Sequence, residues 1–214
     1  MAKQNPGKSV RTRLLNLMNE TGYKYMYLLS RYFNERLLYR VSVSQYKDNF
    51  MLKGGSLLYA ISGLEARPTV DVDFMAESIS RDRAFLPSVS LWAYSLETVI
   101  AEKLHTMIDR DTQNSRMKDF FDCYQLLTNR DINMDTLYEA VKATFNNREL
   151  QYNADLQLFT PSFVTDAARL ARWKSFLKNI QWKDMLSFAD VMQVIADNLQ
   201  PIVEKYWNER NTPH

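Results

Sequence analysis

The chain has 214 residues, of which 46% are hydrophobic and 24% charged, a composition that excludes a disordered protein and allows one substantial core or two smaller ones. Few glycines and prolines, five and six, against 13% aromatic residues disfavour a turn-rich all-β design, so we expect helices to dominate. One cysteine and two histidines exclude an internal disulfide and a Cys/His zinc site, so any metal must be held by oxygen.

The N-terminal part of the chain is basic. The opening run, MAKQNPGKSVRTR, precedes no apolar stretch long enough for a signal peptide or a membrane span, so we expect a cytoplasmic protein without membrane association. Residues 1–53 carry ten Lys and Arg against three Asp and Glu, although the whole chain has a net charge of only +2. This region is either a face that meets phosphates of RNA or an ordinary solvated helix surface.

The first third of the chain predicts helices followed by a short strand. Apolar residues recur at steps of three and four over 10–39 and break before Gly22, which predicts two amphipathic helices joined by a glycine turn. Residues 49–53 predict a strand, and Gly54-Gly55-Ser56 then opens a helix that Gly63 closes.

A strand with one acidic face follows. Residues 69–75, TVDVDFM, alternate strictly, so Asp71 and Asp73 share a face. Carboxylates at i and i+2 on a strand lie about 6–7 Å apart and repel one another unless a cation lies between them. Alone, such a pair also occurs as a solvated strand end, and Gly-Gly-Ser as a plain turn. Their order, strand, glycine turn, helix and acidic strand, predicts a Mg²⁺ or Mn²⁺ site for a nucleoside triphosphate.

The rest of the chain predicts helices. Ser95 caps a helix whose buried stripe includes Ile100, Leu104 and Met107, whereas residues 76–91 are irregular. Further helices are expected at about 115–127, 134–145, 165–177 and 188–207. A loop near residue 130 divides the α/β part from the helical part. We therefore predict an α+β protein with domains 1–130 and 131–214.

Four segments carry a more specific pattern: 50–58 (FMLKGGSLL), 67–74 (RPTVDVDF), 94–104 (YSLETVIAEKL) and 114–122 (NSRMKDFFD). In this order they resemble the two signatures of the AbiEii-type nucleotidyltransferase family, the toxin halves of bacterial abortive-infection toxin–antitoxin pairs. The likeness extends over roughly residues 10–130 and more loosely into the helical tail.

The resemblance implies a polymerase-β-like mixed-sheet core, a helical C-terminal domain and a partner antitoxin. The implied activity transfers a nucleotide from a nucleoside triphosphate to RNA, with tRNA as the favoured acceptor. By the same resemblance, Gly55 and Ser56 face the triphosphate, while Asp71 and Asp73 hold Mg²⁺.

The resemblance also implies that Lys103, Arg116 and Lys118 are cationic contacts to phosphate. The residues themselves leave alternatives open. The stem of Lys103 borders an apolar stripe and could extend its head to water. Arg116 with Asp119, and Lys118 with Asp122, have the spacing of surface ion pairs. We interpret Asp122 as a residue that orients basic side chains and not as a metal ligand.

One segment departs from the family pattern. Family members usually place several tens of residues, with further strands and a third carboxylate, where only residues 75–93 intervene here. Three explanations are open. The segment has a natural deletion, the sequence omits a stretch of the chain, or Glu77 or Asp82 takes the place of the third carboxylate. The remaining alternatives are a degenerate nucleotide-binding protein, transfer to a protein or small molecule, and a helical half that serves as an interaction domain.

Overall fold

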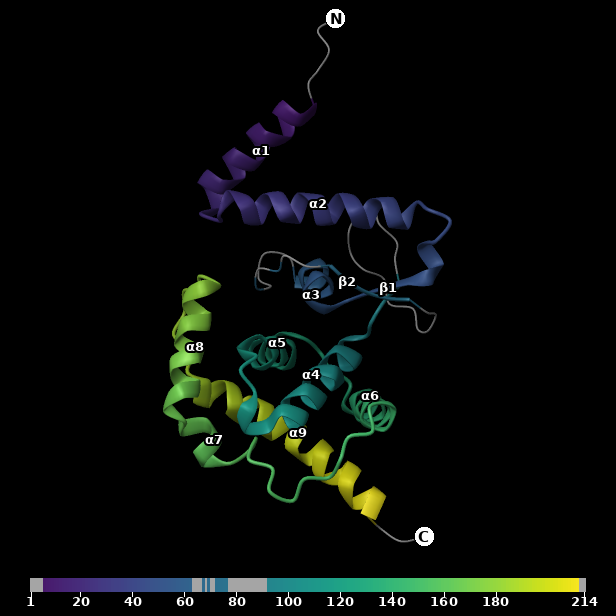
Figure 1. Ribbon diagram of the computed structural model, residues 1–214, viewed down its shortest axis with the longest axis vertical. Helices are drawn as coiled ribbons and strands as arrows, with labels where there is room; N and C mark the ends of the chain where they lie inside the picture. The colour runs from purple at the N-terminus through teal and green to yellow at the C-terminus, as the bar shows by residue number, and fades with distance from the viewer. Residues whose placement is uncertain (1–5, 63–66, 68, 70–71, 77–91, 212–214) are drawn as a thin grey trace, which may run out of the picture. The chain divides into compact units, whose positions relative to one another are not determined.

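Helices dominate the protein, and a small sheet accompanies them, as the sequence predicts (Figure 1). The computed structural model describes residues 6–62, 67, 69, 72–76 and 92–211. The chain divides into two compact units, Met1–Tyr94 and Ser95–His214. The predicted Gly63 helix end and most of the irregular segment, residues 77–91, lie outside the described residues.

The first unit consists of helices around a small sheet. Its elements are α1 (Pro6–Thr21), α2 (Tyr25–Ser42), the 3-10 turn η1 (Lys47–Asn49), β1 (Phe50–Lys53), α3 (Gly54–Ser62), β2 (Asp73–Ala76) and β3 (Trp92–Ala93). Gly22 separates α1 from α2 with a φ of 74°, which confirms the predicted glycine turn. Leu28, Leu52 and Leu57 are each only 1% exposed and belong to the core of this unit.

The sheet has the order β2-β1-β3 and contains both pairing directions. Strand β1 pairs antiparallel with β2, which places Lys53 opposite Asp73, and parallel with β3. The predicted strand over 69–75 is observed as 73–76, so Thr69 and Val72 precede it; Asp71 is outside the described residues. Strand β3 was not predicted, because two residues are too few to show an alternating pattern.

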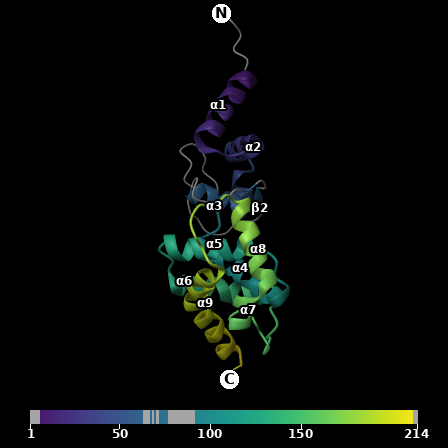
Figure 2. The same ribbon diagram turned by 90° about the vertical axis from the view of Figure 1, so that its left-hand side faces the viewer.

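The second unit is helical. Its elements are α4 (Leu96–Arg110), the 3-10 turn η3 (Asp111–Gln113), α5 (Met117–Asn129), α6 (Met134–Asn147), α7 (Pro161–Thr165), α8 (Ala167–Asn179) and α9 (Phe188–Asn211). Helix α4 packs against α5 and α6, and α5 packs against α9 (Figure 2). The predicted stripe of α4 is buried: Ile100, Leu104 and Met107 are fully inaccessible. Ser95 caps α4 by accepting a hydrogen bond from the Thr98 amide, as predicted.

The compact units divide at a different point from the predicted domains. The sequence predicts a domain boundary near residue 130, whereas the first compact unit ends at Tyr94 and the second begins at Ser95. Helices α4 and α5 therefore belong to the helical unit by packing. The division into compact units does not test how far a transferase domain extends. The domains 1–130 and 131–214 therefore stay a prediction. No helix in the described part of the chain is long and apolar enough to cross a membrane.

Candidate functional site

Gly54 forms the turn between β1 and α3, and Asp73, the first residue of the acidic strand, lies against it. Its φ of 68° lies in the left-handed region that side chains other than glycine rarely adopt. A Cβ atom at this position would overlap the Asp73 carboxylate, with the Asp73 Cγ only 2.9 Å away. Gly54 is therefore required both for the direction of the backbone and for the close approach of Asp73.

Gly55 makes a similar close approach to the segment that precedes the acidic strand. A Cβ at Gly55 would lie 2.6 Å from Thr69 Oγ1, closer than Cβ atoms in proteins approach atoms to which they are not bonded. The next residue, Ser56, is buried in the first turn of α3. The structure thus brings the Gly-Gly-Ser turn and the chain leading into β2 together, as their order in the sequence suggested.

Asp73 is the described carboxylate of the predicted metal pair. It is the first residue of β2, its side chain is exposed, and it makes no ion pair with any residue that the structure describes. Asp71 lies outside the described residues, so its predicted role stays a prediction. Among the described residues, no cluster of three or more His, Cys, Asp or Glu side chains is arranged to hold a metal ion.

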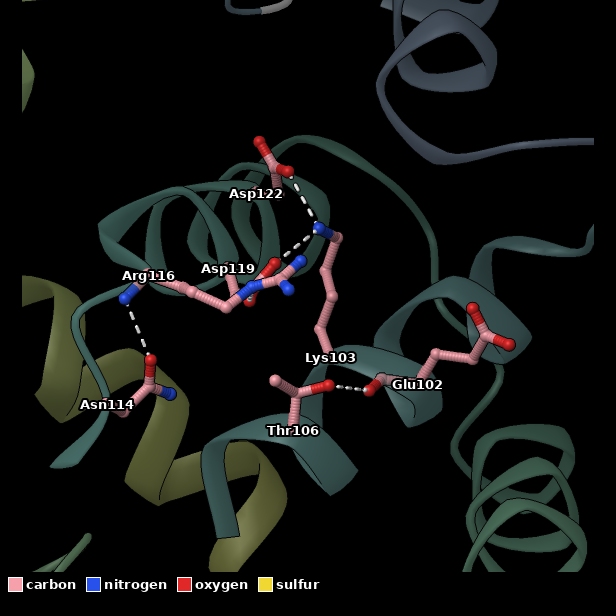
Figure 3. A network of polar contacts seen from close by, with 7 residues as sticks. All are labelled: Glu102, Lys103, Thr106, Asn114, Arg116, Asp119 and Asp122. Atoms are coloured by element: carbon pink, nitrogen blue, oxygen red, sulfur yellow. Dashed lines mark hydrogen bonds and ion pairs between the residues drawn. The ribbon is translucent and has the colours of Figure 1, made fainter. Parts of the chain in front are cut away.

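Lys103 of α4 is bound by two buried carboxylates of α5 (Figure 3). Its Nζ donates to Asp119 Oδ1 at 3.1 Å and to Asp122 Oδ2 at 2.8 Å, and both aspartates are 2% exposed. Burial lowers the pKa of Lys103, but Asp122 and Asp119 together raise it by more, so the net shift is upward and the ammonium stays charged. Asp122 therefore holds a basic residue in place, in agreement with its predicted role.

Arg116 completes this network at the start of α5. Its Nε donates to Asp119 Oδ2 at 2.8 Å, and its backbone N–H donates to Asn114 Oδ1 at 2.8 Å. The predicted i,i+3 partners therefore pair, but not as a surface pair, because Asp119 is buried. Asn114 is fully buried, and its Nδ2 has no hydrogen-bond partner among the described residues. The Arg116 side chain remains 42% exposed, so Arg116 is fixed at one nitrogen and still reaches solvent.

Lys118 behaves differently from the other two predicted cations. It is exposed and makes no ion pair within the part of the chain that the structure describes. The predicted alternative, a surface pair with Asp122, is not formed, because Asp122 faces the buried side of α5 and binds Lys103. Among the three cations, Lys118 is thus the one whose charge is not compensated by a described carboxylate.

The predicted site residues fall into two groups, one in each compact unit. Gly55, Ser56 and Asp73 belong to the first unit, and the three cations belong to the second. In the second unit, the sequence analysis did not assign a role to Asn114 or recognise that Asp119 also binds Lys103. Both residues belong to the 114–122 segment. They lie two and three residues from Arg116, and this spacing could have indicated their contacts with it.

Comparison with protein families identifies the chain. Residues 36–87 and 77–194 match the model of the family described as nucleotidyl transferase AbiEii toxin, type IV toxin–antitoxin system. The chain belongs to this family. Membership implies a nucleotidyl transferase toxin and a cognate antitoxin, and it confirms the resemblance seen in the sequence. Comparisons with curated proteins and with solved structures gave no match.

The family match is divided in the segment where the sequence departs from the family pattern. The two matched segments of this AbiEii family member overlap at residues 77–87, within the short stretch that separates the acidic strand from the helix that begins after Ser95. The Gly-Gly-Ser turn and Asp73 lie in the first matched segment, and the network around Lys103 lies in the second. Both groups of site residues are therefore inside the family match.

Proposed function

We propose that this AbiEii family member is a metal-dependent nucleotidyltransferase with a polymerase-β-like core, which moves a nucleotide from a nucleoside triphosphate to RNA. The acceptor proposed is tRNA, and the biological role proposed is that of a toxin restrained by a cognate antitoxin. Family membership supports transfer of a nucleotidyl group. The metal, the triphosphate and the RNA acceptor are the proposed refinements.

One observation carries the proposal: the Asp73 carboxylate lies directly against Gly54 at the start of α3. An exposed carboxylate without an ion pair to a described residue stands beside the first turn of a helix, where backbone N–H groups have no partner within the helix. Such N–H groups bind phosphate oxygens, and carboxylate oxygens are ligands that Mg²⁺ prefers. The proposed metal ligand and the proposed phosphate-binding amides are thus adjacent, which supports the proposal.

The chemistry follows from these groups. Asp71 and Asp73 would hold Mg²⁺, or Mn²⁺, which when bound neutralises phosphate charge and polarises the phosphorus that is attacked. The amides of Gly55 and Ser56, together with the Ser56 hydroxyl, would orient the triphosphate. With the triphosphate fixed, a hydroxyl of the acceptor would attack the α-phosphorus and lose its proton to solvent, while the bond from the α-phosphorus to the bridging oxygen breaks and pyrophosphate leaves.

The cations of the second unit have different proposed roles. Lys118 and the exposed nitrogens of Arg116 would contact phosphates of the nucleotide or of the RNA. Lys103 is already bound by Asp119 and Asp122, so we assign it a weaker, electrostatic contribution to nucleotide binding. The two aspartates then act as positioning residues, because they fix Lys103 and Arg116 without reaching the substrate.

The test measures transfer of a labelled nucleotide to tRNA. Purified wild-type protein is incubated with bulk tRNA, Mg²⁺ and each of the four triphosphates labelled at the α-phosphorus. We expect Asp73→Asn and Asp71→Asn each to lower the rate by about 100-fold or more, because each removes a proposed ligand of the metal ion that offsets the negative charge developing on the phosphate. Asp48→Asn is the matched control, since Asp48 is an exposed aspartate of the same unit in η1.

The outcomes separate the alternatives. Equal labelling by Asp73→Asn and Asp48→Asn would contradict the proposal. Mg²⁺-dependent nucleotide binding by calorimetry without transfer to any acceptor would identify a degenerate binding protein. A mass increase of lysate proteins or of metabolites, in place of tRNA labelling, would assign a different acceptor.

A further inference from the structure

A pocket lies between α2 and α3 in the first unit, next to the Gly-Gly-Ser turn. It is a small hollow that opens to solvent. Its lining includes Ser56 and Thr69, which flank the glycine turn, and Arg31, Asn34 and Glu35 of α2. The sequence indicated only that the basic region 1–53, which includes α2, either meets phosphates of RNA or is a solvated surface, and the family match begins at residue 36, after Arg31. In the structure, α2 forms one wall of a pocket that contains Ser56, a predicted triphosphate contact.

Arg31 is held rigidly in this pocket. Its guanidinium stacks on the Tyr59 ring of α3, with Cζ 3.9 Å from the ring centroid. Its Nε donates to Glu35 Oε1 at 3.1 Å. The stacking fixes the plane of the guanidinium, and the hydrogen bond fixes its rotation within that plane. The Nη edge of the group is therefore presented in a defined direction.

One nitrogen of this edge has no hydrogen-bond partner within the part of the chain that the structure describes. Arg31 Nη1 is buried and makes no hydrogen bond with any described residue. A buried donor on a charged group that stays unpaired is costly, and proteins rarely retain one without a reason. Tyr27, which also lines the pocket, makes a further side-chain hydrogen bond with Arg31. Even with this contact, the pair with Glu35 and the stack on Tyr59, Nη1 has no hydrogen-bond partner among the described residues.

The ligand that fits this nitrogen is an anionic oxygen. Arginine binds phosphate through the Nη edge, with charge-assisted hydrogen bonds. The competing charge is weak, because the Glu35 side chain is 42% exposed and the pair has the i,i+4 spacing of a solvated helix pair. Ser56 lies in the same pocket and is the residue that the proposed function places on the triphosphate. A phosphate group bound beside Ser56 would therefore share this pocket with Arg31.

We propose that Arg31 is a phosphate-binding residue of the nucleotide site, and that its Nη edge binds an oxygen of the triphosphate beside Ser56. The proposal rests on the proposed function and deepens it, because it makes helix α2 a part of the substrate site. It also supplies the first unit with a cation for the triphosphate.

The experiment compares Arg31→Gln with Arg36→Gln in the full-length chain. Arg36 is the matched control, because it lies on the same helix, is exposed and stacks on an aromatic ring, that of Tyr39, at 4.9 Å. Calorimetry measures binding of a Mg²⁺–nucleoside triphosphate, the matching monophosphate and nucleoside, and inorganic tripolyphosphate. We expect Arg31→Gln to weaken triphosphate and tripolyphosphate binding by about 10- to 100-fold and Arg36→Gln to leave both unchanged.

A second variant separates phosphate binding from a structural role. Glu35→Gln removes the partner of Arg31 but keeps the guanidinium, so triphosphate binding should be retained or become tighter. If Arg31 and Glu35 served only as a stabilising pair, Glu35→Gln and Arg31→Gln would weaken binding and lower the melting temperature together. That result would overturn the assignment.

The remaining outcomes each decide the matter. Equal triphosphate affinity in Arg31→Gln and Arg36→Gln overturns the role of Arg31 and leaves the proposed function in place. An equal loss for nucleoside and triphosphate would make the pocket a base site and would also overturn the proposal. Tripolyphosphate binding that needs Arg31, in a protein that binds no nucleotide, would support the phosphate pocket and contradict the proposed function. Binding of no probe would contradict both.

Discussion

The glycine turn of the first unit and the ionic network of the second place carboxylates in opposite environments. Asp73 is exposed, lies against Gly54 and has no ion pair with a described residue. Asp119 and Asp122 are 2% exposed and bind Lys103. The buried carboxylates position their basic neighbours, whereas Asp73, which has no ion pair with a described residue, is the carboxylate that we propose as a metal ligand. We therefore expect substitutions in the buried network to change stability and substitution of Asp73 to change nucleotide binding.

Removing the cation of the buried network should have the largest effect on stability. Lys103→Met leaves Asp119 and Asp122 buried without their common partner, which we expect to lower the free energy of unfolding by about 3–5 kcal/mol. Lys118→Met is the matched control, since Lys118 is exposed on α5, and should change stability by less than about 0.5 kcal/mol. Urea denaturation followed by circular dichroism measures both. Similar losses in the two variants would remove the distinction between the regions.

Two glycines with similar backbone angles sharpen the comparison within the first unit. Gly22 and Gly54 have φ values of 74° and 68°, but a Cβ at Gly22 would meet no atom within 4 Å, whereas one at Gly54 would overlap Asp73. Gly22→Ala should cost about 1–2 kcal/mol for the left-handed backbone alone. Gly54→Ala should cost this amount and also displace the Asp73 carboxylate, so it alone should reduce nucleotide transfer. Equal transfer by the two variants in the labelling assay would show that the contact has no functional role.

The smallest expected effect is the pH dependence of the network. The folded-state pKa of Lys103 is raised above its ordinary value of 10.5, because the attraction of Asp122 and Asp119 exceeds the effect of burial. A raised pKa contributes stability in full below pH 10.5, and this contribution is lost as pH rises through the folded-state pKa. Wild-type protein should lose more stability than Lys103→Met above that pH in urea titrations. Parallel curves for the two proteins would contradict the upward shift.

Much of the fold was predictable from the sequence. Helical periodicity gave the long helices, and the cap at Ser95 was confirmed, because both depend on residues close together in the chain. The start of β2 at Asp73 was missed, since alternation over 69–75 cannot show where pairing with β1 begins. The resemblance to the AbiEii family was confirmed by the family match.

The partners within the site were less predictable. Lys103 lies 16 and 19 residues from its two carboxylates, so their contacts depend on the packing of α4 against α5 and not on any local spacing. The i,i+4 spacing of Lys118 and Asp122 suggested a pair that packing prevents. Arg31 is one of ten basic residues in the region 1–53, and nothing in the sequence distinguishes it from the others. Only the pocket between α2 and α3 does so.

Metal-dependent nucleotide binding by Asp73 is the most direct measurement of the central claim. A nucleoside triphosphate with a non-cleavable α,β linkage is titrated into wild-type protein, Asp73→Asn and the control Asp48→Asn, with Mg²⁺ present or removed by a chelator. We predict that wild type and Asp48→Asn bind only with Mg²⁺ and that Asp73→Asn loses this dependence together with at least about tenfold in affinity. Binding by Asp73→Asn with wild-type affinity and wild-type Mg²⁺ dependence would contradict the account.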